Sequence, residues 1–464
     1  MTETTDLSIR QLREKFSDRS LSPSEYWLAL ERHIDAWEPT IAALYAYDPE
    51  DTRRQAAAST ERWARGAPLG PLDGIPVTLK ELIATKGQPV PLGTAAVELV
   101  PAAEDAPIAA RMREDGAVIF AKTTCPDYGM LSSGLSSFHQ LSRNPWDPTQ
   151  NPGGSSAGAS AAAAAGYGPL HIGTDIGGSI RLPAGWTGIF GLKPSNGRIP
   201  IDPYYVGRCA GPMTRTVEDA AFSMATLSRP DWRDCTSLPP NEIDWLDLDI
   251  DVRGLKIGLM LDAGCGLPVD GEIRDAVVAA ARRFEEAGAI VIDVAPVLTR
   301  QMLDGLDAFW RARFWGDITA LSEERREMIL PYIYSWAKGG ADISGVDAVR
   351  GFNQTFEMRK SCGRLFSDVD AVLSPTNPIV SYSAEWASPT NDPALPFEHI
   401  GFTVPWNMSE QPAASINCGF SRSGMPIGLQ IVGPRFDDML VLKLSKAFET
   451  WSGGAANWPT PPAP

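Results

Sequence analysis

Apolar and polar positions in the first part of the chain follow the spacing of helices. A capping box from Ser22 to Glu25, with proline at the first helical position, predicts the start of a helix that Pro39 ends. Asp48 caps a second predicted helix, which we expect to run to about Arg65 because a glycine follows there. Residues 1–66 are therefore predicted to form N-terminal helices.

After this region, short apolar runs alternate with helix-spaced segments. The runs predict strands ending at Lys80 and at Thr174 and spanning 117–122, 255–260, 290–294, 370–375, 415–420 and 426–432, and the helix-spaced segments predict helices at 107–115, 216–227, 270–287 and 437–451. Residues 298–366 are predicted to be helical, whereas four prolines make 377–398 a long predicted loop. Such alternation is typical of an α/β fold with a largely parallel or mixed sheet.

The composition is that of an ordinary globular protein. Of the 464 residues, 44% are hydrophobic, which is enough for a sizeable core, and no linker divides the chain, so we expect one domain over 1–464. The net charge of −16, from 41 basic and 57 acidic residues, disfavours nucleic acid or an anionic membrane as the main partner. A polar, acidic start without an apolar signal segment favours a cytoplasmic location.

Cysteine and histidine positions give no sign of a disulfide framework or a metal site. The six cysteines are scattered without a Cys-x-x-Cys pair, and the four histidines are not spaced as metal ligands. We therefore expect reduced thiols, no metal and no cofactor. Any hydrolytic chemistry is expected to use neither a metal nor a histidine base.

Two serines, each preceded by two glycines, are the strongest candidates for chemistry. Glycine lets the backbone turn sharply at Ser155 and Ser179 and lets a ligand approach closely. Consecutive N–H groups in such a turn can point into one concavity, which suits a developing oxyanion. The N–H groups of Ile176, Gly177, Gly178 and Ser179 are the candidates for this oxyanion hole.

A serine hydroxyl is a weak nucleophile and needs a base. Lys80 ends an apolar predicted strand, and burial can lower a lysine pKa from about 10.4 by roughly 3–5 units, which favours the neutral amine. The alternative interpretation is that Lys80 lies on the surface and that Ser179 is only a turn residue. These residues alone leave both interpretations open.

Six motifs, in one order along the chain, resemble the amidase signature family. They are Gly74–Glu81, Gly153–Ser160, Gly173–Arg181, Gly191–Arg198, Gly211–Asp219 and Gly424–Gln430. The resemblance covers roughly residues 20 to 450. It implies the amidase signature fold, with a central mixed, largely parallel β-sheet covered by helices on both faces, a signature core at 67–232 and a variable substrate-pocket region at 298–410.

The resemblance also implies a Ser–cis-Ser–Lys mechanism. Ser179 matches the nucleophile, Ser155 the serine that follows a cis peptide bond, and Lys80 the base. Lys80 would draw a proton from Ser179 through Ser155 and return it to the leaving amine.

Four further residues match supporting positions of the family. Thr174 and Ser156 match positions that hydrogen-bond near the nucleophile and the cis serine. Asp175 and Arg181 are expected to hold the loop by charge-assisted hydrogen bonds, a structural role as consistent with their positions as a catalytic one.

Departures from the family pattern favour a stand-alone hydrolase. After Arg181 the chain reads Leu-Pro-Ala-Gly-Trp-Thr-Gly, where the glutaminase subunit of tRNA-dependent amidotransferases has Gln-Pro-Ala-X-Cys-Gly. Tyr204-Tyr-Val also replaces the Ser-Ser-Leu of that subunit. A glutaminase subunit that supplies ammonia to a partner chain, or an inactive binding protein on the same scaffold, are the alternatives.

Three other motifs compete with this assignment. Ser156 fits the Gly-x-Ser-x-Gly nucleophile elbow, but that elbow needs a strand before it, and 144–152 is rich in turn residues. Residues 153–158 begin like a phosphate-binding loop, but the required Lys-Ser or Lys-Thr is missing. Ser335 and Lys338 fit Ser-x-x-Lys, a short match without its companion motifs.

The variable region is where we expect substrate selection. Its large aromatic residues, most of them expected in the core and a few facing the cavity, include Trp310, Trp315, Trp336, Trp386, Trp406, Phe309, Phe314 and Phe402. An apolar pocket would suit amides, anilides or carbamates with apolar or aromatic groups, and esters as side substrates. By resemblance, the backbone near Gly129 and Met130 would accept a hydrogen bond from the substrate amide nitrogen. The expected partners are these small molecules, and we expect a monomer or a homodimer.

Overall fold

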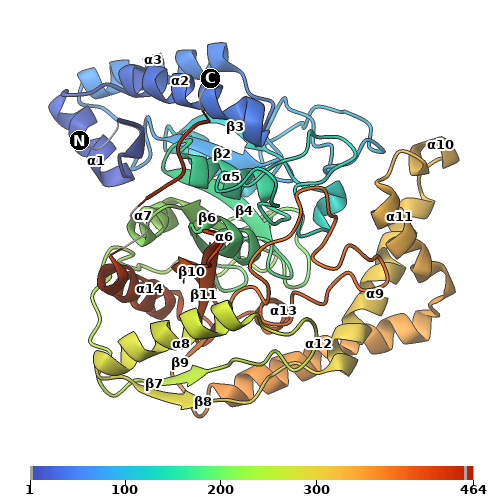
Figure 1. Ribbon diagram of the computed structural model, residues 1–464. Coiled ribbons are helices and arrows are strands. Elements are labelled where there is room, and N and C mark those ends of the chain that lie inside the picture. Colours follow the sequence, from blue (N-terminus) through green and yellow to red (C-terminus); the bar gives the residue numbers. More distant parts are fainter. Residues whose placement is uncertain (1–3, 454–456, 463–464) are drawn as a thin grey trace.

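One mixed β-sheet runs through the molecule, and the computed structural model describes residues 4–453 and 457–462. The strands are β1 (Leu44–Tyr45), β2 (Pro76–Lys80), β3 (Val118–Thr123), β4 (Leu170–Asp175), β5 (Phe190–Lys193), β6 (Cys209–Thr214), β7 (Lys256–Leu259), β8 (Ile290–Asp293), β9 (Ala371–Pro375), β10 (Ala413–Phe420) and β11 (Pro426–Val432). They lie in the order β1-β3-β2-β4-β6-β5-β10-β11-β9-β7-β8 (Figure 1).

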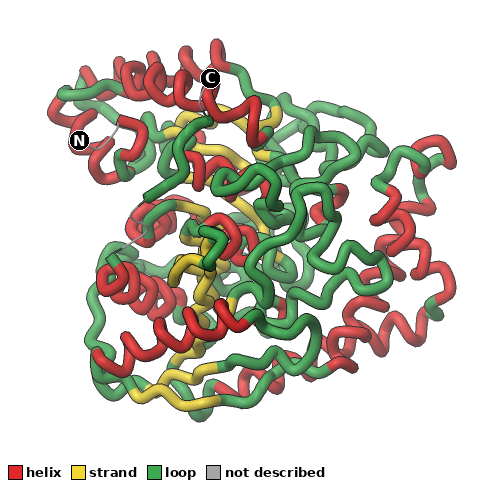
Figure 2. The backbone as a smooth tube through the Cα atoms, in the orientation of Figure 1, coloured by secondary structure: helices red, strands yellow, loops and turns green. Residues whose placement is uncertain are grey.

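Helices surround this sheet, as the tube in Figure 2 shows. They are α1 (Ile9–Asp18), α2 (Pro23–Ile41), α3 (Pro49–Ala64), α4 (Pro107–Glu114), α5 (Ala157–Ala165), α6 (Arg181–Thr187), α7 (Val217–Leu227), α8 (Gly271–Glu286), α9 (Arg300–Thr319), α10 (Glu323–Arg326), α11 (Pro331–Lys338), α12 (Gly345–Leu365), α13 (Val404–Met408) and α14 (Asp438–Ser452). Helices α5 and α6 pack against each other and on one face of the strands, and α7, α8 and α14 cover the other face. The predicted α/β class with helices on both faces is confirmed.

The strand directions differ in one respect from the sequence prediction. Strand β2 is parallel to β3 and β4, and β7 is parallel to β8 and β9. Between these two groups, however, every pairing from β4 through β6, β5, β10 and β11 to β9 is antiparallel. The sheet is therefore mixed as predicted, but it is not largely parallel. Short connections such as the turn between β10 and β11 permit only antiparallel neighbours.

Most predicted elements are present at the expected positions, and the capping box at Ser22 opens α2 as predicted. Pro39 does not end that helix, which continues to Ile41. The proline lies in the last turn, and the Ala42 N–H caps the helix by donating to the Glu38 carbonyl. Strands β5 and β6 were not predicted, because Pro212 and several glycines argue against a central strand.

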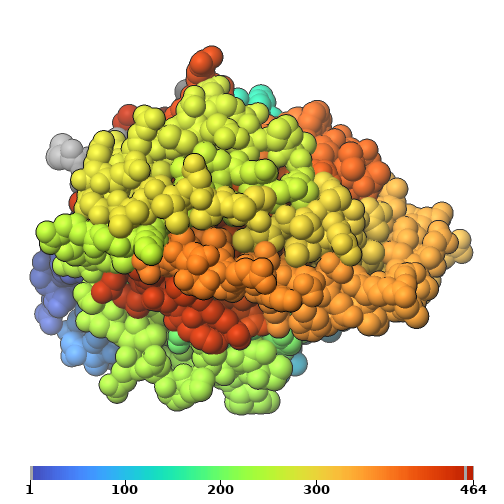
Figure 3. Space-filling model, turned by 90° about the horizontal axis from the view of Figure 1, so that it is seen from below, coloured from blue at the N-terminus to red at the C-terminus, as the bar shows by residue number. Residues whose placement is uncertain are grey.

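The segment from α9 to α12 forms a helical lobe beside the sheet, at the right of Figure 1. Seen from below, its surface extends well to one side of the molecule (Figure 3). Its buried side chains belong to a second hydrophobic core that includes Leu131, Leu182 and Trp186 from the signature region. This shared core fixes the lobe against the loop that follows β3 and against helix α6. Within the described residues, no helix is long and apolar enough to cross a membrane.

Candidate active site

Lys80 is the last residue of β2 and is completely buried. Its Nζ donates a hydrogen bond to Ser155 Oγ at 2.7 Å and to Ser156 Oγ at 3.1 Å. Burial lowers the pKa of Lys80 to about 8, and the positive charge of Arg208 acts in the same direction. The lysine is therefore held against two serine hydroxyls with its basicity reduced, and it is not a surface residue.

Ser155 directly precedes Ser156, the N-cap of α5, and the Gly154–Ser155 peptide bond is cis, as the family resemblance implies. The side chain is buried and borders a cavity. Gly129 closes in on it from the other side, since a Cβ there would lie 3.4 Å from Ser155 Oγ. Ser155 thus sits between the lysine and the open space of the cavity.

Ser156 ties the two halves of the site together. Its N–H donates to the Ser179 carbonyl at 3.2 Å, and its Oγ accepts the Thr174 N–H at 3.2 Å. The same hydroxyl lies 3.2 Å from the Thr174 carbonyl, to which it can donate. Ser156 therefore supports the positions of the other residues and has no open path to the cavity, because it is completely buried.

Ser179 lies in the short loop between β4 and α6, on the wall of the same cavity as Ser155. A buried ion pair braces this loop: Arg181 Nε lies 3.0 Å from Asp175 Oδ2, and Arg181 Nη2 lies 3.0 Å from Asp175 Oδ1. Asn407 donates to Asp175 Oδ1 at 2.8 Å, and Gln430 accepts from Arg181 Nη1 at 2.8 Å. Asp175 and Arg181 thus hold the loop, and both are completely buried.

The backbone N–H groups around Ser179 are not equivalent. The Gly178 N–H donates to Asp175 Oδ1 at 2.8 Å, so it binds the carboxylate of the buried ion pair and does not point a free donor into the cavity. Within residues 4–453 and 457–462, the N–H groups of Ile176, Gly177 and Ser179 donate to no protein acceptor. Gly178 has a φ of +130° and a Cβ there would lie 2.5 Å from Thr403 Oγ1, which explains the glycine. Of the four N–H groups predicted to form an oxyanion hole, these three have no protein acceptor within the described residues.

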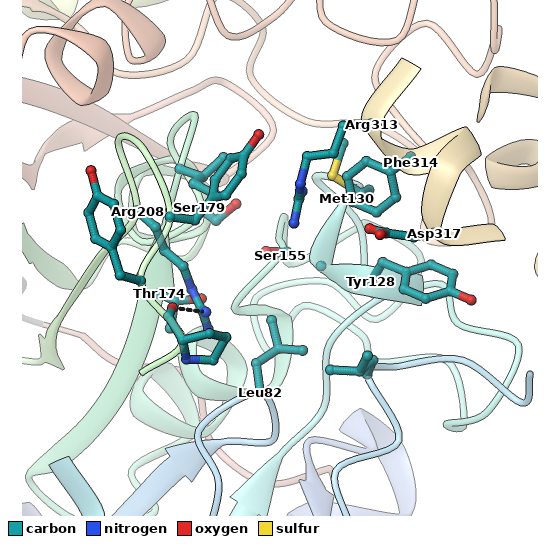
Figure 4. Close-up of a pocket in the computed structure, with 16 residues that line it drawn as sticks. Leu82, Tyr128, Met130, Ser155, Thr174, Ser179, Arg208, Arg313, Phe314 and Asp317 are labelled. Carbon is teal, nitrogen blue, oxygen red and sulfur yellow. Dashed lines mark hydrogen bonds between the residues drawn. The ribbon is translucent and has the colours of Figure 1, made fainter. Parts of the chain in front are cut away.

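Two spaces meet at Ser179. The larger is a cavity of about 270 Å³ lined by Leu82, Leu92, Tyr128, Gly129, Met130, Ser155, Thr174, Ile176, Ser179, Pro203, Tyr204, Tyr205, Arg208, Arg313, Phe314 and Asp317 (Figure 4). The smaller, a recess of about 30 Å³, is lined by Gly129, Met130, Leu131, Ser132, Ile176, Gly177, Ser179, Leu182, Trp310, Phe397 and Ile400. Ser155 borders only the larger cavity, whereas residues of the Ser179 loop border both spaces.

Gly129 and Met130 border both spaces, as expected of residues that contact substrate. Within the described part of the chain, their carbonyl oxygens accept no hydrogen bond from protein. They are therefore available to a substrate amide nitrogen. The kink that presents them includes Tyr128, whose φ is 54°.

The aromatic residues of the variable region are mostly core, as predicted. Trp336, Trp406 and Phe402 are buried away from the cavity, Phe309 packs on Phe352, Trp315 packs on Tyr334, and Trp386 is 42% exposed. Trp310 lines the recess and Phe314 lines the larger cavity. The larger cavity is less apolar than expected, because Arg208, Arg313 and Asp317 also face it.

These three charged residues, with Tyr128, Tyr204 and Tyr205, were not predicted from the sequence as site residues. Arg208 precedes β6 and Arg313 lies on α9, and neither belongs to a glycine-flanked motif. A helix-spaced set at positions 310, 313, 314 and 317 was the available signal, since such spacing places side chains on one helix face. That face borders both spaces, with Trp310 on the recess and the others on the cavity.

A mixed α/β sheet holds a buried lysine against two serine hydroxyls of one glycine-rich loop, which is the arrangement of a class of amide hydrolase. A family model described as Amidase matches residues 26–442. The chain belongs to this family of amidase signature enzymes and is a hydrolase of C–N bonds.

Two curated relatives illustrate the range of the family. A glutamyl-tRNA(Gln) amidotransferase subunit of Myxococcus xanthus is 33% identical over 481 residues, which cover 96% of this chain and 97% of that protein. An acylamidase of Rhodococcus erythropolis is 31% identical over 454 residues, which cover 96% of this chain and 95% of that protein.

Solved structures of similar fold include a member of the same family. A bacterial aryl acylamidase of the amidase signature family superimposes with a TM-score of 0.88 at 31% identity, covering 96% of each chain. A 6-aminohexanoate cyclic dimer hydrolase also has a TM-score of 0.88, at 24% identity and with 99% of each chain covered, and shares the fold.

Proposed function

We propose that the protein hydrolyses amides, anilides or carbamates that carry apolar or aromatic groups, through a triad of Ser179, Ser155 and Lys80. The observation that carries this proposal is the buried hydrogen bond from Lys80 Nζ to Ser155 Oγ, on a cavity that Ser155 shares with Ser179. The similarity to an acylamidase and to an aryl acylamidase supports amide and anilide substrates.

The first half of the reaction forms an acyl-enzyme. Ser179 Oγ attacks the carbonyl carbon while its proton passes to Ser155 Oγ, and the Ser155 proton passes to neutral Lys80 Nζ. The negative charge that develops on the carbonyl oxygen is stabilised by the N–H groups of the Ser179 loop. Lys80 then returns a proton through Ser155 to the leaving nitrogen, and the C–N bond breaks.

The second half releases the acyl group. Water enters in place of the amine and attacks the ester carbonyl, and its proton passes through Ser155 to Lys80. Collapse of this second tetrahedral intermediate breaks the bond to Ser179 Oγ, which recovers its proton. Esters follow the same path, so we expect esterase activity as well.

Substitution of the nucleophile tests the chemistry. Ser179→Ala should abolish both hydrolysis of nitroanilides and labelling by a fluorophosphonate, whereas Ser223→Ala, a buried helical serine on α7, should leave both intact. Labelling that persists in Ser179→Ala, or that maps to Ser156 in the wild type, would overturn the assignment.

Substitution of the base tests the proton path. Lys80→Ala should reduce hydrolysis of amides far more than that of nitrophenyl esters, because an amine is a poor leaving group without a returned proton. Equal losses on both substrates would mean that Lys80 is not the proton shuttle.

A glutaminase subunit that passes ammonia to a partner is the second candidate, favoured by the 33% identity to an amidotransferase subunit. A panel of nitroanilides, aryl carbamates, nitrophenyl esters and glutamine separates the two. Purified alone, a stand-alone hydrolase should cleave the anilides or carbamates, whereas preference for glutamine would favour the glutaminase. A catalytically idle binding protein is disfavoured because Lys80, Ser155 and Ser179 are all present. Lys80 is hydrogen-bonded to Ser155, and both serines line the same cavity.

A further inference from the structure

Two arginines face the larger cavity from different parts of the chain. Arg208 stands just before β6, and Arg313 stands on α9 (Figure 4). In Figure 4 they enter the cavity from opposite sides, and Ser155 is seen in the space between them. Neither takes part in the proposed proton transfers, although the positive charge of Arg208 helps to lower the pKa of Lys80.

Neither guanidinium is neutralised by the protein. Arg208 Nη1 donates to the Pro203 carbonyl at 2.8 Å, and Arg313 lies over the Tyr205 ring at 3.9 Å from its centroid. Among residues 4–453 and 457–462, no carboxylate forms an ion pair with either. Arg208 is half-buried and Arg313 is exposed on α9, whereas the completely buried Arg181 has such a partner.

Two carboxylates lie near the pair of arginines, although neither forms an ion pair with it. Asp317, one helical turn after Arg313, faces the cavity from its exposed rim, and Asp202 lies near Arg208 on the exposed loop before β6. Burial and the charge of Arg313 lower the pKa of Arg208 to about 10, which still leaves it charged at neutral pH. Two like charges that share a partly closed space repel each other, and an anion between them relieves this repulsion.

The position of Ser155 shows which half of a substrate meets these arginines. In the proposed mechanism Ser155 hands the proton to the leaving nitrogen, and Ser155 borders only the larger cavity. The amine half must therefore lie in the larger cavity, beside Arg208 and Arg313. The acyl half is left with the recess, whose volume of about 30 Å³ suits a short apolar group against Trp310.

We propose that the amine half of the preferred substrate carries a carboxylate, which Arg208 and Arg313 bind together. Guanidinium groups pair with carboxylates through two parallel N–H···O bonds, and Tyr204, Tyr205 and Phe314 offer ring faces beside them. The substrate class is a short N-acyl derivative of an amino acid or of an aromatic amine that bears a carboxylate. This inference rests on the proposed amidase mechanism.

The test compares substrates that differ only in charge. We expect kcat/KM for 4-acetamidobenzoate to exceed that for the neutral 4-acetamidobenzamide by at least about tenfold, as hydrogen bonds to charged groups imply, mainly through a lower KM. The ratio of the two values should fall towards one in Arg208→Gln and in Arg313→Gln. Arg350→Gln, an exposed arginine on α12, is the matched control and should keep the wild-type ratio.

A variant that keeps the positive charge but lacks the planar guanidinium group provides a second comparison. Arg208→Lys should give a ratio between those of the wild type and Arg208→Gln, because lysine keeps the charge but cannot bind in a bidentate manner. A sulfonate analogue of 4-acetamidobenzoate distinguishes a carboxylate site from a general anion site. Equal preference for the sulfonate would overturn the assignment of a carboxylate.

Binding to an inactive variant keeps the inference testable if the hydrolysis assay fails. Calorimetry with Ser179→Ala should give a Kd for 4-acetamidobenzoate at least about tenfold below that for 4-acetamidobenzamide, with the difference lost when Arg208→Gln is added. Cleavage of neutral anilides without any preference for the carboxylate would overturn this inference and leave the amidase function standing. Carboxylate-selective binding without hydrolysis would overturn the proposed function alone.

Discussion

Lys80 Nζ lies 2.7 Å from Ser155 Oγ, although 75 positions of the chain separate the two residues. The contact exists because β2 and β4 are parallel neighbours, so that the end of β2 and the loops around α5 and α6 meet at one edge of the sheet. Water does not reach the lysine, which is completely buried. The sheet therefore fixes the position of Lys80, the base of the proposed triad.

Reaction with a fluorophosphonate should depend on the ionisation of Lys80. Its pKa is lowered to about 8, and only the neutral amine accepts a proton, so the labelling rate should rise with pH through a midpoint near 8. Arg208→Gln should move this midpoint to higher pH, because the positive charge of Arg208 helps to lower the pKa of Lys80. Measured labelling rates from about pH 6 to 10 check both statements, and a midpoint that stays in place in Arg208→Gln would contradict the second.

Breaking the buried pair of Asp175 and Arg181 should destabilise the protein strongly. Arg181→Met leaves the Asp175 carboxylate buried without its cation, a change that costs about 3–5 kcal/mol in comparable sites. Urea unfolding measures the loss. The double variant Asp175→Asn/Arg181→Met should be more stable than Arg181→Met alone, since no unpaired charge remains. A double variant that is less stable would show that the unpaired charge is not the main cause of the loss.

Gly158→Ala should destabilise the protein through a steric clash. Helix α5 is packed so closely that a Cβ at this position would lie 2.2 Å from the Ala43 carbonyl oxygen. Gly271→Ala is the control, because a Cβ at this first residue of α8 would meet no atom within 4 Å and alanine is the better helix former. We expect a lower Tm for Gly158→Ala and an unchanged or higher Tm for Gly271→Ala, and equal values would refute the packing argument.

Asp219 should make the stability of the fold fall as the pH rises. Burial raises the pKa of this carboxyl from 3.8 to about 7, although it accepts the Ile9 N–H at 2.8 Å. The folded protein therefore binds a proton that the unfolded chain has lost between about pH 4 and pH 7, and folding free energy is lost across this window. Asp219→Asn should remove this pH dependence, worth up to about 4 kcal/mol for a shift of about three units.

Asp347 occupies the same third helical position on α12 and is the matched control for Asp219. It is exposed, and a hydrogen bond from Ser344 lowers the pKa of its carboxyl. Its contribution to stability is present above about pH 4 and is lost as the pH falls, which is the opposite direction. Chemical unfolding of wild type, Asp219→Asn and Asp347→Asn between about pH 2 and 8 distinguishes the two. A wild-type profile that matches Asp219→Asn would contradict the assignment.

The sequence indicated the residues of the proposed triad but not the charged residues of the cavity, for a physical reason. Glycine-flanked serines and an apolar run that ends on Lys80 are local patterns, and the family resemblance ordered them. Arg208 and Arg313 carry no local pattern, because their role depends on where β6 and α9 come together. The hydrogen bond from the Gly178 N–H to Asp175 could not be predicted, because the two groups meet only when the turn is folded. Strands β5 and β6 were missed because their glycines and Pro212 are tolerated by the surrounding sheet.

Helix α9 presents Trp310, Arg313, Phe314 and Asp317 along one face, and this face borders both spaces beside Ser179. None of the four takes part in the proton path. Substitutions at these four positions can therefore change substrate specificity during evolution while the residues of the proposed triad stay the same. A mutagenesis library confined to these four positions should yield variants that prefer other substrates and remain active. Gene duplicates can diverge in specificity in the same way.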